Sequence, residues 1–127
     1  MTRVTVNILV EFYLSSGYDT VESYRDLIAW KKAKELALDV YTCTREFPRS
    51  EIYGLSAQMR RAAVSVPSNI AEGKGRYSQR EFVQFLHHAR GSLLELETQL
   101  EIARDLGYFD SCTFKRIAAR AQKWAES

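Results

Sequence analysis

The sequence contains only two cysteines, Cys43 and Cys112, and they lie far apart in the chain. Small domains that depend on disulfide bonds carry more cysteines at close spacings, so a disulfide framework is excluded. Two prolines and six glycines are too few for a turn-rich all-β fold or for a low-complexity linker. No apolar run approaches the roughly 18 residues of a membrane span, and we expect no membrane association. The formal net charge of +2 gives no strong overall field toward nucleic acid.

The length of 127 residues and the hydrophobic content of 46% fit one domain with a real core. The charge is weak but patterned along the chain. Residues 60–91 carry six basic and two acidic side chains, or +4, whereas residues 92–110 carry one basic and five acidic side chains, or −4. This alternation fits one basic and one acidic face, which suits self-association. Ordinary solvated helix faces are the alternative interpretation.

Residues 1–22 differ from the rest of the chain. Val4, Val6, Ile8 and Val10 alternate with other residues at a period of two, which is typical of a strand. Glutamate at position 11 interrupts the apolar stretch, which argues against a signal peptide. We interpret residues 1–22 as a flexible or strand-like N-terminal arm outside the fold, and residues 23–127 as the domain.

The domain shows apolar residues at spacings of three and four, which predicts helices. Ser23 is a candidate N-cap for a helix over residues 24–46, which Pro48 ends. A second helix spans residues 54–73, and Pro67 inside it predicts a kink. A third helix ends at Gly107. Asp110 is a candidate cap for a fourth helix. Short connections between long helices favour neighbours that run in opposite directions, so the sequence predicts an all-α fold, an antiparallel up-down-up-down four-helix bundle.

The third helix has the clearest start. Ser78 and Glu81 form the pattern of a capping box, and Tyr77 and Phe82 flank it as a hydrophobic staple does. An apolar heptad pattern then continues over three repeats, which predicts a long helix with one buried stripe. The stripe consists of Phe82, Leu86, Ala89, Leu93, Leu96, Leu100 and Ala103.

Motifs for catalysis and metal binding are missing from the sequence. A di-iron bundle needs Glu-x-x-His on two helices, and residues 84 and 85, three before His87 and His88, are Gln and Phe. The chain also lacks a P-loop, a Gly-x-Ser-x-Gly motif and a dinucleotide fingerprint. The sequence therefore predicts no catalytic residue, no metal ligand, no cofactor and no enzyme activity.

The segment from Gly73 to Arg76 holds two glycines and two basic residues, and Arg80 follows in the first turn of the next helix. Glycines let backbone N–H groups approach a ligand, and a helix N-terminus favours anions. Lys74, Arg76 and Arg80 are therefore candidates for contact with nucleic-acid phosphates. The alternative interpretation is a tight turn in which the glycines supply left-handed geometry.

Other basic residues extend this set. Arg60 and Arg61 form a pair on the second helix, and Arg90 lies on the third, so the sequence predicts six nucleic-acid-binding residues in all. Ion pairing with Glu95 or Glu101 of another helix is the alternative use of Arg60 and Arg61. Gly91 lies in the middle of the third helix, where a close crossing of helices or of subunits would explain it. Tyr53 and Tyr77 are candidates for base stacking.

One stretch of the second helix is specific enough to suggest a family. It runs from Gln58 through Met59-Arg60-Arg61-Ala62-Ala63 to Ser65-Val66-Pro67-Ser68-Asn69-Ile70-Ala71-Glu72-Gly73. With the Tyr24-Arg25-Asp26-Leu27 opening and Ala89-Arg90-Gly91-Ser92, it closely resembles the proteins encoded within intervening sequences of bacterial 23S ribosomal RNA genes. The resemblance covers about residues 23–125 and leaves the N-terminal arm outside.

The resemblance implies a small cytoplasmic bacterial protein with a four-helix bundle that assembles as a ring-shaped homopentamer. A related branch, the accessory proteins of diversity-generating retroelements, implies nucleic acid and a reverse transcriptase as partners. The resemblance implies no catalytic residues. Two hypotheses follow: an oligomer that contacts RNA or DNA phosphates, or a protein-interaction scaffold whose arginines serve subunit packing.

Overall fold

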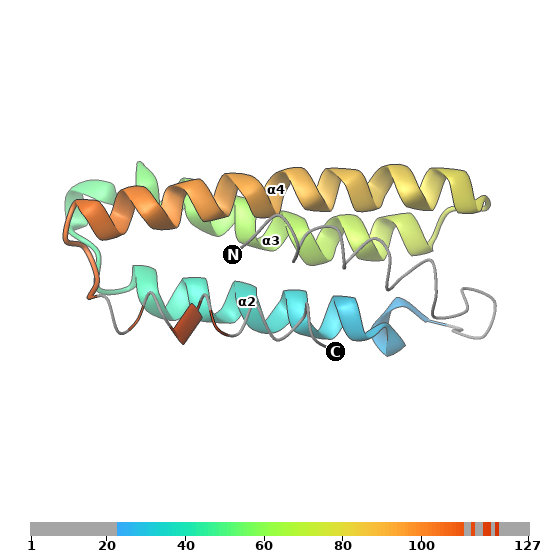
Figure 1. Cartoon of the computed structure of the whole chain (residues 1–127), viewed down its shortest axis with the longest axis horizontal. Coiled ribbons are helices and arrows are strands. Elements are labelled where there is room, and N and C mark those ends of the chain that lie inside the picture. The colour runs from blue at the N-terminus through green and yellow to red at the C-terminus, as the bar shows by residue number, and fades with distance from the viewer. Residues whose placement is uncertain (1–22, 111–112, 114–115, 118, 120–127) are drawn as a thin grey trace.

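The computed structural model of the chain describes residues 23–110, 113, 116–117 and 119, and these residues form helices and turns with no strand among them (Figure 1). Three long helices carry the fold: α2 (Ile28–Thr44), α3 (Leu55–Lys74) and α4 (Gln79–Asp105). Two short 3-10 turns precede them, η2 (Tyr24–Asp26) before α2 and η3 (Arg49–Glu51) before α3. The described part of the chain is therefore a helical bundle, as predicted.

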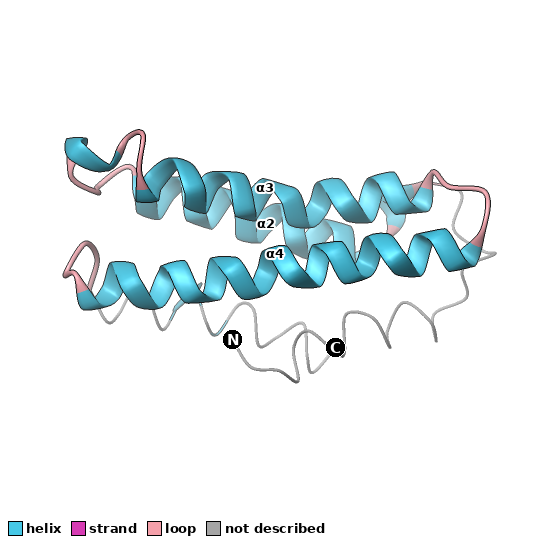
Figure 2. Cartoon of the chain, turned by 90° about the horizontal axis from the view of Figure 1, so that it is seen from above, coloured by secondary structure: helices cyan, strands magenta, loops and turns pink. Residues whose placement is uncertain are grey.

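Successive helices run in opposite directions along one common axis (Figure 1). In the view from above, α3 lies along one edge of the bundle, and both α2 and α4 lie below it in the picture (Figure 2). Helix α3 contacts both α2 and α4, so it is the central element of the described bundle. The predicted N-terminal arm, residues 1–22, lies outside the described residues.

The apolar stripes of the three helices meet in one core. All seven predicted heptad positions of α4 are buried, and the stripe of α3 is buried at Met59, Ala62, Val66 and Ile70. Helix α2 contributes Ala33, Leu36 and Val40, each fully buried. Burial of each Val, Leu, Ile, Phe or Met side chain in this core stabilises the fold by roughly 1.5–3 kcal/mol relative to exposure.

The start of the first predicted helix differs from the prediction. Ser23 does act as a cap, since its hydroxyl accepts a hydrogen bond from the Arg25 N–H at 3.2 Å. It caps only the turn η2, because the backbone of Leu27 then turns to an extended conformation. This break buries the Leu27 side chain, and the α-helix begins at Ile28.

The Ser78 cap predicted at the start of α4 is formed, but the staple is not. The Ser78 hydroxyl accepts from the Glu81 N–H at 3.2 Å, and it also lies 3.1 Å from the Glu81 carboxylate. Phe82 is fully buried, whereas Tyr77 is fully exposed, so the two rings do not pack together. The predicted hydrophobic staple is therefore wrong, because Tyr77 projects from the turn into solvent.

The two predicted glycine stops behave differently. Gly107 ends α4 with a φ of +75°, a left-handed conformation that favours glycine. Gly73 has no such conformation and lies within α3, which continues to Lys74 and is capped by Gly75. The left-handed interpretation of Gly73 is therefore wrong, and its role is a packing role described below.

The beginning of a further helix is visible after α4. The Asp110 carboxylate accepts a hydrogen bond from the Thr113 N–H at 2.7 Å, which is the predicted cap contact. Residues 113, 116, 117 and 119 are helical, and Ile117 is buried in the core. The apolar spacing of the predicted fourth helix also includes Phe114, Ala118, Ala121 and Trp124, which lie outside the described residues. Pro67 lies within α3, whose helical assignment is unbroken around it, and the kink there stays a prediction.

Candidate nucleic-acid interface

The six predicted basic residues lie in several places on the bundle. Arg60 and Arg61 are near the start of α3, Lys74 is its last residue, Arg76 is in the following turn, and Arg80 and Arg90 are on α4. Fourteen residues separate Arg60 from Lys74, which corresponds to about 21 Å along a helix. The set therefore forms separate basic regions along α3 and α4.

Arg60 is held against α2. Its Nε donates a hydrogen bond to the Thr44 hydroxyl at 2.8 Å, and its guanidinium lies 4.7 Å from the centre of the Tyr41 ring. Thr44 is buried and in turn donates to the carbonyl of Val40 at 2.8 Å. Tyr41 follows the apolar spacing of the first predicted helix, yet it lies on the partly exposed surface beneath Arg60. These contacts fix the Arg60 side chain at the junction of α2 and α3.

Arg61 is paired across the α3–α4 seam. Its guanidinium lies 3.0 Å from the Glu95 carboxylate, which also accepts from the Gln99 amide at 3.3 Å. The alternative interpretation of Arg61, an ion pair with Glu95 of another helix, therefore describes this contact correctly. The Arg61 side chain is still 67% exposed, so most of its surface faces solvent and the pair is a surface ion pair.

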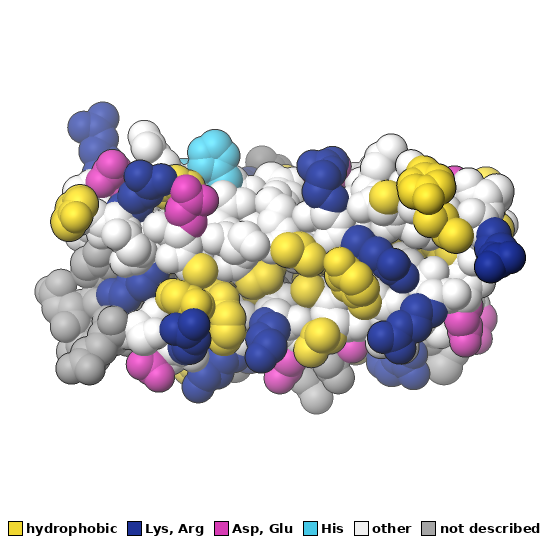
Figure 3. Space-filling view, turned by 180° about the vertical axis from the view of Figure 1, so that it is seen from behind, with side chains coloured by type: hydrophobic (Ala, Val, Ile, Leu, Met, Phe, Trp, Pro, Cys, Tyr) yellow, Lys and Arg dark blue, Asp and Glu magenta, His cyan; other side chains and the backbone are white. Residues whose placement is uncertain are grey.

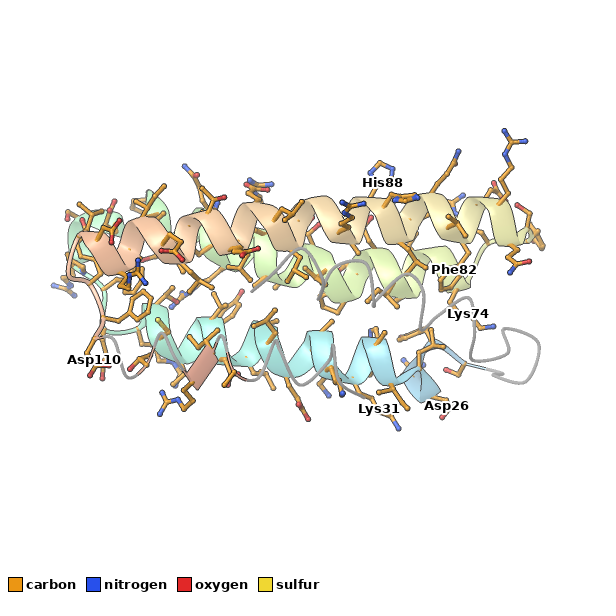
Figure 4. The ribbon with its side chains drawn as sticks, in the orientation of Figure 1. Asp26, Lys31, Lys74, Phe82, His88 and Asp110 are labelled. Carbon is orange, nitrogen blue, oxygen red and sulfur yellow. The ribbon has the colours of Figure 1, made fainter. Side chains whose placement is uncertain are left out.

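The turn between α3 and α4 gathers three basic side chains within seven residues, namely Lys74, Arg76 and Arg80. The Arg76 guanidinium bonds the Glu72 carboxylate at 2.9 Å and lies 4.7 Å from the centre of the Phe85 ring. Arg80 is exposed on the first turn of α4. Lys74 lies at the end of the bundle where α3 passes into α4 (Figure 4). This turn has the densest positive charge among the six predicted residues.

The backbone of this turn does not form the predicted cradle for a phosphate. The Gly75 N–H donates to the carbonyls of Ala71 and Glu72, both at 3.2 Å, and the Arg76 N–H donates to the carbonyl of Gly73 at 3.1 Å. These N–H groups close the end of α3. The Gly75 and Arg76 N–H groups are therefore already engaged and do not face a bound anion.

Gly73 is needed for the close approach of α3 to α4. A Cβ placed on Gly73 would lie 2.7 Å from the Cβ of Phe85, a separation that real side chains essentially never show. Gly73 is buried at this crossing. The glycine therefore serves packing, and it leaves the Phe85 ring in place beneath Arg76.

Arg90 and Gly91 lie apart from these regions. Ser92 faces α3, since its hydroxyl lies 2.8 Å from that of Ser65. Arg90 is two residues earlier, or about 200° around the helix, and so lies on the other side of α4. Gly91 has open space where a side chain would be, so no close crossing within the described chain explains it.

Asn69 contributes to the same α3–α4 seam. Its amide donates to the Ser65 carbonyl at 2.8 Å and to the Ser65 hydroxyl at 2.9 Å. The carbonyl that loses its helical donor at Pro67 belongs to Ala63, four residues before the proline. Asn69 thus has a structural contact with a backbone carbonyl, two residues after the one that Pro67 leaves without its helical donor.

Sequence reasoning missed two arginines beside Arg60. Arg45 and Arg49 line a hollow with Arg60, Phe47, Pro48 and Ile52. A second hollow adjoins it along the outer face of α3 and is lined by Tyr41, Ile52, Arg60, Arg61, Val64 and Ser68, among others. Among the residues that the structure describes, no acidic side chain lines either hollow. Arg45 and Arg49 flank the turn after α2, but only the packing of α2 on α3 brings them to Arg60.

Figure 3 shows this face of the bundle, with hydrophobic side chains along its middle and Lys and Arg side chains among and around them. The acidic residue Glu72 is also exposed on α3, where Arg76 pairs with it. The outer face of α3 is therefore both apolar and basic, a combination suited to bases as well as to phosphates.

A few titratable groups have shifted pKa values. Burial, with a contribution from Glu46, raises the pKa of the Cys43 thiol to about 11. Burial and the nearby Glu101 raise the pKa of Glu97, and a hydrogen bond to Glu51 raises the pKa of Tyr108. Cys43 is a small buried side chain with a free thiol.

The described residues form neither a cluster of metal ligands nor a membrane-spanning helix. No three His, Cys, Asp or Glu side chains among them gather as a metal site would require. Their helices likewise include none whose length and hydropathy would allow it to span a lipid bilayer.

Comparisons with known proteins address the fold and the family. No curated protein matches this chain. The crystal structure of a protein of unknown function from the S23 ribosomal protein family of Bacteroides thetaiotaomicron is similar, with a TM-score of 0.67 and 20% identity. The match covers 78% of this chain and 93% of that one, and it shows a shared fold. A family model described as 23S rRNA-intervening sequence protein matches residues 25–126. The chain therefore belongs to the 23S rRNA-intervening sequence protein family.

Proposed function

We propose that this protein is a non-enzymatic, oligomeric four-helix bundle that contacts RNA or DNA phosphates through a basic surface. The basic cluster at the α3–α4 turn, Lys74, Arg76 and Arg80, carries the proposal. Arg76 and Arg80 are exposed there, and the Phe85 ring beneath Arg76 gives its guanidinium a fixed platform. Arginine presents donors that fit phosphate oxygens, and a positioned arginine loses less side-chain freedom when it binds.

Arg60 and Arg61 extend the surface along α3. Arg60 has one nitrogen committed to Thr44, but its guanidinium has further donors, and it lines both hollows of this face. Arg61 is mostly exposed in spite of its pairing with Glu95. Arg90 lies on the other side of α4, so a single bound strand on the α3 face would not reach it.

The fourth helix belongs to the proposal. The Asp110 cap and the buried Ile117 support a helix that begins at Asp110 and returns along the bundle. With α2, α3 and α4 it would complete the up-down-up-down arrangement. A kink of α3 at Pro67 is part of the same proposal.

We also propose self-association as a homopentamer in the cytoplasm, the assembly and compartment that the family resemblance implies. The outer side of α4 supports an interface, because Gly91, Leu94, Thr98 and Ile102 are exposed and follow one another at helical spacings of three and four. Glu95, Glu101 and Asp105 are exposed nearby and give this side a negative charge. A negatively charged side of this kind suits contact with basic side chains of another copy.

A protein-interaction scaffold is the second candidate function. The bonds from Arg61 to Glu95 and from Arg60 to Thr44 favour it, because both arginines already serve packing within the subunit. In this reading the exposed arginines pair with acidic residues inside the oligomer, and nucleic acid does not bind.

The test is binding of the full chain to a structured RNA and to a DNA duplex over a series of salt concentrations. The variant Lys74→Ala/Arg76→Ala/Arg80→Ala removes three cations. Each lost phosphate contact lowers the slope of log affinity against log salt by about 0.7–0.9, so we expect a slope smaller by about 2–3.

A matched control removes three cations elsewhere, in Arg25→Ala/Lys31→Ala/Lys34→Ala. Lys31 lies on the side of α2 away from α3 and α4 (Figure 4), so we expect the control to keep most of the binding. Absence of binding by the folded wild-type oligomer at low salt would overturn the proposal and favour the scaffold. Equal losses of affinity in both variants would contradict a binding site at the α3–α4 turn, because net charge alone would then explain the binding.

A further inference from the structure

Two tyrosines are fully exposed at opposite ends of α3. Tyr77, in the turn after the helix, is 104% exposed, and Tyr53, in the turn before it, is 96% exposed. The other exposed large apolar side chains of the described residues keep 59% or less of their surface in solvent. A tyrosine ring normally contributes to stability by burial, so neither ring serves the fold in this way.

Each ring has cations beside it. Tyr77 directly follows Arg76, which is positioned by Glu72 and Phe85, and Arg80 is three residues further on. Tyr53 follows the turn η3, which contains Arg49. A negatively charged strand that passes either ring would therefore meet basic side chains within a few residues of that ring.

The surface between the two rings continues the same chemistry. Along the outer face of α3 the two adjoining hollows share Ile52 and Arg60, and Arg45, Arg49 and Arg61 line their sides. Tyr41 adds a third aromatic ring in this region and lies against the Arg60 guanidinium. Apolar side chains lie along the middle of this face, with basic ones around them (Figure 3).

We propose that the outer face of α3 binds an unpaired nucleic-acid strand, with bases stacked on Tyr77 and Tyr53 and phosphates held by the arginines between them. A duplex keeps the faces of its bases covered by their neighbours, so exposed rings gain stacking partners from unpaired bases only. The inference rests on the proposed function, and it names the class of nucleic acid and its path.

The path has a definite length. The 20 residues of α3 span roughly 30 Å at 1.5 Å per residue. A stacked strand advances about 3.4 Å per nucleotide, so about nine nucleotides reach from one tyrosine to the other. The affinity of oligonucleotides therefore rises steeply up to about this length and then levels off.

The experiment measures binding of the full chain to labelled 15-nucleotide oligouridine and oligothymidine, and to 15-base-pair RNA and DNA duplexes at one low salt concentration. We expect the single strands to bind at least tenfold more tightly than the duplexes. The two single strands together show whether the sugar matters. Shorter strands of four and eight nucleotides test the predicted length.

The variants Tyr77→Ala and Tyr53→Ala remove a ring each, and Tyr77→Phe and Tyr53→Phe keep the ring as matched controls. Loss of one stacked base weakens single-strand binding roughly 5- to 150-fold, while the phenylalanine variants bind as the wild type does. Duplex binding is unchanged in all four. Because both side chains are exposed, the variants are expected to fold, and circular dichroism checks this.

The outcomes separate the two proposals. Equal affinity for single strands and duplexes, or single-strand binding that is unchanged in both alanine variants, would overturn the inference and leave the phosphate contacts standing. Absence of binding to every nucleic acid would overturn the proposed function as well. Displacement of oligouridine by a 15-residue polyglutamate peptide as readily as by unlabelled oligouridine would assign the face to an acidic protein instead.

Discussion

Gly73 of α3 packs so closely on Phe85 of α4 that a methyl group at position 73 would lie 2.7 Å from the Phe85 Cβ. The Cβ of Phe85 is fixed to its own helix, so it cannot move aside as the end of a flexible side chain would. The contact therefore sets the distance between the two helices at the end where the basic cluster lies.

Replacement of this glycine should destabilise the fold. We expect Gly73→Ala to lower the free energy of unfolding by about 1–3 kcal/mol, the usual range for overpacking, in spite of the higher helix propensity of alanine. Urea unfolding followed by circular dichroism measures the change. An unchanged or higher free energy of unfolding would contradict the proposed role of the glycine.

Gly91 is the matched control within α4, because nothing lies within 4 Å of a Cβ placed there. In the separated subunit, Gly91→Ala should raise the free energy of unfolding by about 0.5–1 kcal/mol, since alanine favours the helix. If Gly91 lies at a subunit contact, the same variant weakens association, which sedimentation at several protein concentrations detects. An alanine that destabilises the isolated subunit would show that the open space is filled.

The adjacent arginines should contribute unequally to stability. Arg60 donates to the buried Thr44 and lies on Tyr41, so we expect Arg60→Ala to cost about 1–2 kcal/mol. Arg61 pairs with Glu95 at an exposed position, and Arg61→Ala should cost less than about 0.5 kcal/mol.

Double-mutant cycles check this difference, with Thr44→Val as partner of Arg60→Ala and Glu95→Ala as partner of Arg61→Ala. We expect a coupling free energy near 1 kcal/mol for the first pair and a much smaller one for the second. The reverse order would mean that the α3–α4 ion pair, rather than the α2–α3 hydrogen bond, holds the arginines.

Cys43 should make stability depend on pH above 9. Burial, together with Glu46, raises the pKa of the folded thiol to about 11 from an ordinary value of 9.0, so the unfolded chain ionises first as the pH rises. The contribution of Cys43 is fully present below pH 9 and is lost between pH 9 and 11. Two pKa units correspond to about 2–3 kcal/mol.

The measurement compares wild type with Cys43→Ala, both with Cys112→Ser, by urea unfolding at pH 8 and at pH 11. The difference in the free energy of unfolding between the two proteins should shrink at the higher pH. Other titrating groups are common to both proteins, so their contributions cancel in this difference. An advantage that is the same at both pH values would contradict the raised pKa.

The cap of α4 should be worth a measurable amount. Ser78→Ala removes the hydroxyl that accepts from the Glu81 N–H, and we expect a loss of about 1 kcal/mol, with a smaller loss for Ser78→Gly. Ser50→Ala, at an exposed position in η3, is the control. Equal effects at both serines would show that the cap contributes nothing specific.

Much of the fold could be predicted because α4 follows a strict apolar heptad. A side chain every three or four residues returns to one side of a helix, so all seven predicted positions are buried in the core. The cap at Ser78 and the helix end at Gly107 could also be predicted, since each depends on residues within one turn.

Features that depend on tertiary contacts could not be predicted in this way. Tyr41 lies on the stripe of α2, but Arg60 of α3 holds its ring at the surface. The extended backbone at Leu27 interrupts a helix whose periodicity continues across the break. Local spacing contains no information on either.

The candidate site shows the same division. Glu95 was one of two acidic partners proposed for the arginine pair, and the structure joins it to Arg61. The contact of Arg60 with Thr44 was not predicted, because a threonine in a buried stripe has no charge to suggest a partner. Arg45 and Arg49 were missed because only the register of α2 against α3 brings them to Arg60.

The short connection between α3 and α4 has a consequence for how the chain folds. Residues 75–78 join two long helices that pack together, and Ser78 caps the second of them. Closing so short a loop costs little chain entropy, and the contacts that it allows are local in sequence. We expect this helical hairpin to form in the folding transition state, with high φ-values at Ala89 and Leu93, and α2 to dock on it afterwards.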